Sequence, residues 1–160
     1  LYEFLDKRNC YPRMNTYRGK FSPKNPSKYK GDVLGIVYRS LWERTLFRWL
    51  DEQSFVVSWS SEEVVIPYRC KTDGRIHRYF VDVKFEFTDG RIMLIEVKPS
   101  KEVSPPKNTG RKTRRYITEV MTYAKNISKW EAATEYAADR GWIFEIWDEN
   151  MLRKLGMKIL

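Results

Sequence analysis

A central stretch of alternating apolar and polar residues, from Tyr79 to Lys98, predicts a β-hairpin. The apolar positions of its first strand recur at every second residue: Tyr79, Val81, Val83, Phe85 and Phe87. In the second strand, Ile92 and Leu94 share a face with Glu96 and Lys98. Two charged side chains therefore end an otherwise apolar face.

The length of the turn decides whether Asp82 joins Glu96. A two-residue loop would put the two carboxylates on opposite faces of the sheet. A three-residue loop at 88–90, with Gly90 in the left-handed conformation, brings Asp82 directly opposite Glu96, and we expect this loop. Opposed carboxylates repel each other unless a cation lies between them. The hairpin therefore predicts a divalent-cation site, with Lys98 one pleat further along.

A helix is predicted from Ser40 to about Glu52, and its first turn has the Ser-x-x-Glu pattern of a capping box. On a helical wheel Glu43 lies inside the apolar arc, between Phe47 and Leu50. An unpaired charge directed toward the core is unfavourable unless a metal or an ion pair compensates it. Glu43 is therefore either a cap partner or a carboxylate of the cation site, and we favour the second role.

The remaining pattern completes an α/β arrangement with a mixed four-stranded sheet flanked by helices. A strand at 61–68 ends in a second Thr-Asp-Gly turn at 72–74, so we expect it to pair with the Asp82 strand in a three-stranded meander. Glu62 and Glu63, at its start, are either exposed or close to the cation. The later elements are a helix at 114–125 with apolar core positions, a helix capped by Ser128 that runs to Arg140, a buried strand at 142–147 and a short helix at 148–155.

Composition favours a polyanionic partner. The chain has 160 residues, enough for one domain, and 30 Lys and Arg against 21 Asp and Glu give a formal charge of +9. No apolar run approaches a membrane span and no signal-peptide layout precedes the domain, so we expect a cytoplasmic protein. Cys10, Cys70 and the single His77 suggest neither a disulfide scaffold nor a zinc site, so any metal is expected to have oxygen ligands.

Two basic segments are candidates for contact with the phosphate backbone of a nucleic acid. We divide the chain into a basic N-terminal arm at 1–36, irregular from 18 to 32, and a domain at 37–160; Met14 suggests that 1–13 are an appended remnant. The candidate cations of the arm are Arg18, Lys20, Lys24, Lys28 and Lys30, with Tyr17, Phe21 and Tyr29 able to pack or stack. Those of the segment that follows Lys98 are Lys101, Lys107, Arg111, Lys112, Arg114 and Arg115.

An Asp on one strand and Glu-x-Lys on the next resembles the active site of the PD-(D/E)XK nucleases, and a Glu on the first helix resembles their TnsA-like branch. Five segments also resemble the head-completion nucleases of T-even-type tailed phages: 24–32, 38–43, 65–68, 78–82 and 95–99. Val81 stands where the superfamily name has Pro. The resemblance implies a restriction-endonuclease-like core.

The resemblance also implies Mg²⁺-dependent hydrolysis of DNA phosphodiester bonds, with Mn²⁺ as a substitute. Asp82, Glu96 and the Val97 carbonyl would hold the metal, and Lys98 would orient and activate water. Glu43 would bind the same metal, a second metal or a water. Both endonuclease and exonuclease action are compatible with these residues.

The family implies action on packaged phage DNA before the tail joins the head, in the host cytoplasm during assembly or in association with the virion. Double-stranded DNA is the expected partner, together with phage head or portal proteins, and neither a membrane nor a small-molecule cofactor is expected. Two alternatives are a recombination or restriction enzyme of the same superfamily and a non-catalytic DNA-binding head–tail adaptor. The presence of Glu43, Asp82, Glu96 and Lys98 argues against the adaptor.

Overall fold

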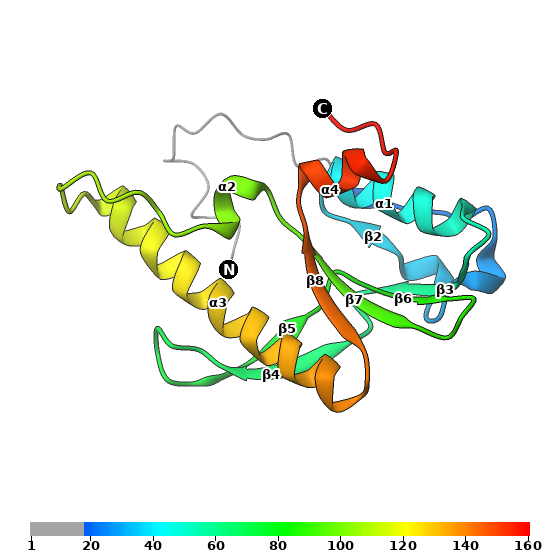
Figure 1. Ribbon diagram of the computed structural model, residues 1–160, viewed down its shortest axis with the longest axis horizontal. Helices are drawn as coiled ribbons and strands as arrows, with labels where there is room; N and C mark the ends of the chain where they lie inside the picture. The colour runs from blue at the N-terminus through cyan, green and yellow to red at the C-terminus, as the bar shows by residue number, and fades with distance from the viewer. Residues whose placement is uncertain (1–17) are drawn as a thin grey trace.

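The computed structural model describes residues 18–160, and its centre is a mixed four-stranded sheet (Figure 1). The strand order is β3-β6-β7-β8, in which β7 pairs antiparallel with β6 and parallel with β8. No helix among the described residues is long and apolar enough to cross a membrane. The elements in chain order are β1 (Gly19–Lys20), η1 (Pro26–Lys28), η2 (Val33–Gly35), β2 (Val37–Tyr38), α1 (Leu41–Glu52), β3 (Val56–Ser61), β4 (Val65–Arg69), β5 (Ile76–Phe80), β6 (Val83–Phe87), β7 (Ile92–Val97), α2 (Ser100–Val103), α3 (Arg114–Asp139), β8 (Ile143–Trp147) and α4 (Glu149–Lys154).

Helices cover both faces of the sheet (Figure 1). On one face, α1 and α4 pack over a core that includes Phe85 and Ile95. On the other face, α3 packs with Leu94 and the β4–β5 hairpin in a second core. Neighbouring residues of β7 thus point into different cores, as the alternation of a strand that is buried on both faces requires.

The three-residue turn between β6 and β7 is confirmed. The register pairs Val83 with Ile95 and Glu86 with Ile92. The backbone N–H of Gly90 donates to the Phe87 carbonyl at 3.0 Å, and Gly90 has a φ of +88°, in the left-handed region that a glycine adopts without strain. Extending this register by one residue places Asp82 opposite Glu96.

The predicted meander is wrong, because the first strand of the hairpin is interrupted at Asp82. β4 and β5 form a separate two-stranded sheet, and β3 takes the place beside β6. At the interruption the Glu62 N–H faces the carbonyls of both Val81 and Asp82, at 3.2 and 3.3 Å. Glu62 itself has a φ of +56°, which is uncommon for a residue other than glycine. The chain thus leaves one sheet and enters the other at the candidate catalytic aspartate.

The predicted helix break at Ser128 is also wrong, because α3 is continuous over 26 residues. The Ser128 hydroxyl donates to the Ala124 carbonyl within the helix and accepts the Lys71 N–H from the β4–β5 turn. The first half of α3 is less buried than predicted, with Ile117 51% and Met121 47% exposed. β8 lies where the fourth strand was expected, although Ile143 at its start is 46% exposed.

The described part of the basic arm packs onto the core more closely than its composition predicted. Tyr29 and Ile36 are buried in the α1 core. The Lys28 ammonium donates to three carbonyl groups at the end of α1, those of Leu50, Asp51 and Gln53, at 3.1, 2.9 and 2.8 Å. These bonds satisfy acceptors that a helix end leaves without partners. Residues 1–13, with Cys10, and Tyr17 lie outside the described residues.

The anchoring of this segment predicts that Asp51 contributes strongly to stability. Its carboxylate is 2% exposed and accepts the backbone N–H groups of Lys24 and Asn25. Asp51→Ala should lower the free energy of unfolding by about 3 kcal/mol, because two backbone N–H groups lose a charged acceptor. Glu52→Ala, which removes only the exposed ion pair with Lys24, should change it by less than about 1 kcal/mol. Equal effects in urea unfolding would contradict this assignment.

Candidate active site

Asp82 and Glu96 come together at the open end of the β6–β7 hairpin. The Asp82 Oδ2 accepts the Val97 backbone N–H at 2.8 Å, so the neighbouring strand fixes the orientation of the carboxylate. Glu96 is 6% exposed, and its Oε2 accepts the Tyr79 hydroxyl at 2.5 Å. In each of the two carboxylates, one oxygen is therefore fixed by a hydrogen bond that it accepts.

Lys98 completes the predicted arrangement. Its Nζ lies 3.7 Å from Glu96 Oε1 and 4.0 Å from Glu102 Oε2. The Lys98 backbone N–H donates to the Trp147 carbonyl at 3.1 Å, which attaches the end of the β7 strand to β8. Its side chain is 22% exposed, so the ammonium lies between the buried carboxylate and solvent.

Glu43 makes the capping contacts and also faces the site. The Ser40 hydroxyl accepts the Glu43 N–H at 3.1 Å, as in a capping box, whereas the Glu43 carboxylate accepts the N–H of Arg39, the residue before the cap, at 2.7 Å. Glu43 is nevertheless close enough to Asp82 for its negative charge to affect the titration of Asp82. The two roles that the sequence left open are therefore compatible.

The electrostatics of the site are dominated by burial and by like charges. Burial first, and then the charges of Glu96 and Glu43, raises the pKa of Asp82 well above its ordinary value. Burial also raises the pKa of Glu43, against the hydrogen bonds from Arg39 and Ser40. The cluster would be relieved by a positive charge, and carboxylate oxygens are the ligands that Mg²⁺ and Mn²⁺ prefer. The donor set thus fits a divalent cation.

Two residues of the site were missed by sequence reasoning. Tyr79 was expected only as an apolar strand position, yet its hydroxyl binds Glu96. A continuous strand would put Tyr79 and Asp82 on opposite faces, so alternation could not pair them. Lys129, on α3, places its ammonium 5.4 Å from the centre of the Tyr79 ring, and burial lowers its pKa against the attraction of Glu96. Because a helix break was expected just before Lys129, no sequence signal placed it here.

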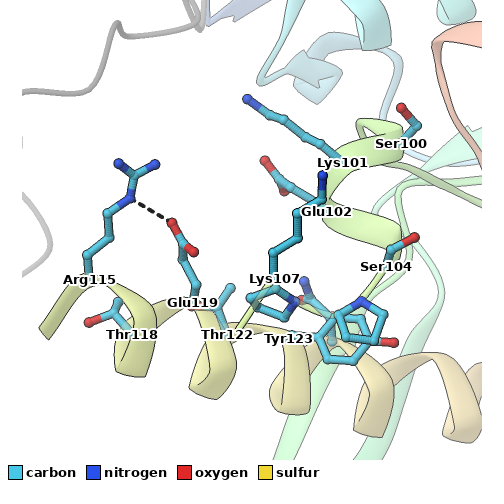
Figure 2. Close-up of a pocket in the computed structure, with 13 residues that line it drawn as sticks. Ser100, Lys101, Glu102, Ser104, Lys107, Arg115, Thr118, Glu119, Thr122 and Tyr123 are labelled. Carbon is cyan, nitrogen blue, oxygen red and sulfur yellow. Dashed lines mark hydrogen bonds and ion pairs between the residues drawn. The ribbon is translucent and has the colours of Figure 1, made fainter. Parts of the chain in front are cut away.

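The predicted DNA-binding cations fall into three groups. Lys101, Lys107 and Arg115 line one cavity between α2, the segment after it and the first half of α3 (Figure 2). The others that lie exposed are Arg18, Lys20, Lys24, Lys30, Arg111, Lys112 and Arg114. Lys28 is instead held by the three carbonyl groups at the end of α1.

A second group of possible metal ligands was not expected. Cys70, Asp73 and His77 have ligand atoms within 4.8 Å of one another around the β4–β5 turn, a grouping that the sequence argument about cysteine and histidine did not predict. Within the turn, Cys70 Sγ contacts the Thr72 hydroxyl, and His77 Nε2 lies 2.7 Å from Asp73. Among the described residues, the carboxylates of Glu43, Asp82 and Glu96 do not form a group as close as this one. A cation bound by all three carboxylates would draw them together.

The raised pKa of Asp82 predicts a pH-dependent stability. Between its unfolded and folded pKa values the folded state binds more protons, so Asp82 makes the metal-free protein less stable as pH rises through that range. Asp82→Asn, which keeps an oxygen for the Val97 N–H, should therefore raise the free energy of unfolding in EDTA at neutral pH by more than the ~0.5 kcal/mol of a typical surface substitution.

Asp89→Asn is the matched control for that measurement. The Arg91 backbone N–H lowers the pKa of Asp89, so this carboxylate stabilises the fold above its unfolded pKa. Its removal should change stability in the opposite direction at neutral pH. Urea unfolding in EDTA, measured from acidic to neutral pH, distinguishes the effects of the two substitutions on stability. An Asp82→Asn variant that is as stable as the parent at neutral pH, or less stable, would contradict the proposed repulsion.

The comparisons with known proteins agree with the resemblance inferred from the sequence. A family model described as TnsA-like endonuclease N terminal matches residues 53–149, which include Asp82, Glu96 and Lys98 but not Glu43. The head completion nuclease of Enterobacteria phage T4 is 43% identical over 146 residues, covering 89% of this chain and 97% of the relative. The mixed sheet and its flanking helices are of the PD-(D/E)XK type. The chain therefore belongs to the TnsA-like endonuclease family of PD-(D/E)XK nucleases.

Proposed function

We propose that the chain hydrolyses phosphodiester bonds of double-stranded DNA and requires Mg²⁺, with Mn²⁺ as a substitute. The observation that carries this proposal is the juxtaposition of Asp82 and Glu96 by the hairpin register, with the Lys98 ammonium 3.7 Å from Glu96. Family membership supports a nuclease, and the formal charge of +9 suits a polyanionic substrate.

The metal is assigned to Asp82, Glu96 and the Val97 carbonyl. When bound, it would polarise a nonbridging phosphate oxygen and offset the negative charge of the transition state. The Val97 N–H orients Asp82 and the Tyr79 hydroxyl orients Glu96, so both carboxylates are preorganised. Glu43 is assigned to the same metal, a second metal or a bound water.

Lys98 is assigned to the attacking water and to the transition state. Its ammonium can hydrogen-bond the water and hold it in line with the bond that breaks. The same charge compensates the phosphorane-like transition state, where a positioned donor is more effective than in bulk water. As the new P–O bond forms, the water gives up a proton to solvent, and the P–O bond to the leaving oxygen breaks as that oxygen takes a proton from solvent.

Substitutions at Glu96 and Lys98 test this assignment. Glu96→Gln and Lys98→Met should each lower the rate of Mg²⁺-dependent DNA cleavage by at least about 10²-fold, since each removes one preorganised charge. Lys154→Met removes an exposed cation of α4 and should leave the rate within about twofold. Supercoiled circular DNA is the substrate, because its nicking identifies an endonuclease. A well-folded parent without activity in Mg²⁺ or Mn²⁺ would contradict the proposal.

The exposed cations around the cavity are proposed to bind the phosphate backbone. Lys101→Ala and Lys107→Ala should each reduce the slope of log affinity against log salt by about 1. Lys28→Ala should lower thermal stability and leave this slope unchanged, because its ammonium already binds the end of α1. Fluorescence anisotropy in EDTA at several salt concentrations measures the slopes. An unchanged slope in both the Lys101→Ala and Lys107→Ala variants would show that these cations do not bind the phosphate backbone.

The biological role that we propose is the one in the name of the relative, head completion in a phage. The chain would then act on packaged DNA in the cytoplasm of the infected host, with phage head or portal proteins as further partners. In this role the protein could also stay associated with the virion. We assign the nuclease activity to the domain at 37–160, preceded by the basic arm at 1–36. Complementation of a phage T4 mutant that lacks the relative, by this chain but not by its Glu96→Gln variant, would support the role. Failure of an active parent to complement would contradict it.

A further inference from the structure

A cavity of about 740 Å³ lies between α2, the segment that follows it and α3. This volume is within the range of about 300–1,000 Å³ that is typical of small-molecule sites. Pro105, Pro106 and Tyr123 supply apolar wall, while Lys101 and Lys107 supply cations. Figure 2 shows Lys101 and Glu102 extending from α2, and Tyr123 on the α3 side of the cavity.

Asn126 is the polar group that makes this cavity unusual. It lines the cavity and is only 7% exposed, yet its side chain makes no hydrogen bond to any other described residue. Its amide atoms are not among the fully enclosed polar atoms of the described residues, so the carboxamide can hydrogen-bond only to what enters the cavity. An amide presents donors and an acceptor side by side, which is the pattern of a nucleobase edge.

The cavity lies next to Lys98, the lysine of the proposed active site. Glu102 lines the cavity, and its carboxylate lies 4.0 Å from the Lys98 ammonium. The helix α3 joins the two regions as well, since it carries Asn126 in the cavity and Lys129 beside Tyr79 in the active site. A strand bound in the cavity would therefore have its next phosphates close to Lys98.

We propose that this cavity binds one unpaired nucleotide of the DNA substrate. Asn126 hydrogen-bonds the edge of the base, Tyr123 and the two prolines contact its faces, and Lys101 and Lys107 hold the adjoining phosphates. A base in a duplex is paired and stacked, so the occupant comes from an overhang or a frayed end. This inference rests on the proposed function and refines its substrate to DNA with an unpaired nucleotide beside the scissile bond.

Binding without cleavage tests this inference. Two duplexes of equal length and sequence are compared in EDTA, one blunt and one with a short single-stranded end that carries 2-aminopurine. The parent should bind the overhang duplex at least about 5-fold more tightly than the blunt one, as expected for one stacked base. The fluorescence of 2-aminopurine should change on binding.

Asn126→Leu gives the sharpest variant, because it keeps the size of the side chain and removes the unpartnered amide. The melting temperature of the protein should be unchanged or higher, while the preference for the overhang falls to within about twofold. Tyr123→Ala should weaken the preference similarly. Met121→Ala is the matched control, since Met121 is exposed on α3 and does not line the cavity.

Equal affinity of the parent for the two duplexes would overturn the inference. So would a preference that survives both Asn126→Leu and Tyr123→Ala, or an Asn126→Leu variant that is clearly less stable than the parent, which would give the amide a structural role. Because binding is measured in EDTA, these results are independent of catalysis. A parent that prefers the overhang but cleaves nothing in Mg²⁺ would contradict the proposed nuclease mechanism and leave the nucleotide site intact.

Discussion

The repulsion between carboxylates at the end of the β6–β7 hairpin is the constraint on which the candidate site depends. Asp82, Glu96 and Glu43 come from a strand interruption, a buried strand and the first turn of a helix. Burial and the neighbouring charges raise the pKa of Asp82. The fold therefore holds the carboxylates in positions where their negative charge is unfavourable. Backbone N–H groups, the Tyr79 hydroxyl and the Lys98 ammonium compensate only part of this charge. Strain of this kind is common where a ligand supplies the missing interaction.

The hairpin was predictable because its logic is local. Alternation identified the strands, and the length of the Thr-Asp-Gly turn determined which face carries Asp82. The capping box at Ser40 and the helix end at Gly141 follow from equally local rules. Sequence alone thus predicted the hairpin register that brings Asp82 opposite Glu96, with Lys98 3.7 Å from Glu96.

What the sequence did not predict depends on contacts between distant segments. The strand is interrupted at residues 81–82, where the Glu62 N–H faces the carbonyls of Val81 and Asp82, and this contact cannot be inferred from alternation. α3 continues through Ser128 because that hydroxyl bonds within the helix and to Lys71, although serine more commonly caps a helix. Tyr79 and Lys129 reach the candidate active site only through these two features.

The most direct measurement of the central claim is the binding of Mn²⁺ to the protein, followed by isothermal titration calorimetry. If Asp82 and Glu96 share a cation, the parent binds Mn²⁺, the Asp82→Asn and Glu96→Gln variants bind it at least about tenfold more weakly, and His77→Ala binds it like the parent. Unchanged binding by Asp82→Asn and Glu96→Gln, with loss of binding in His77→Ala, would place the metal at the β4–β5 turn and contradict the account of the active site.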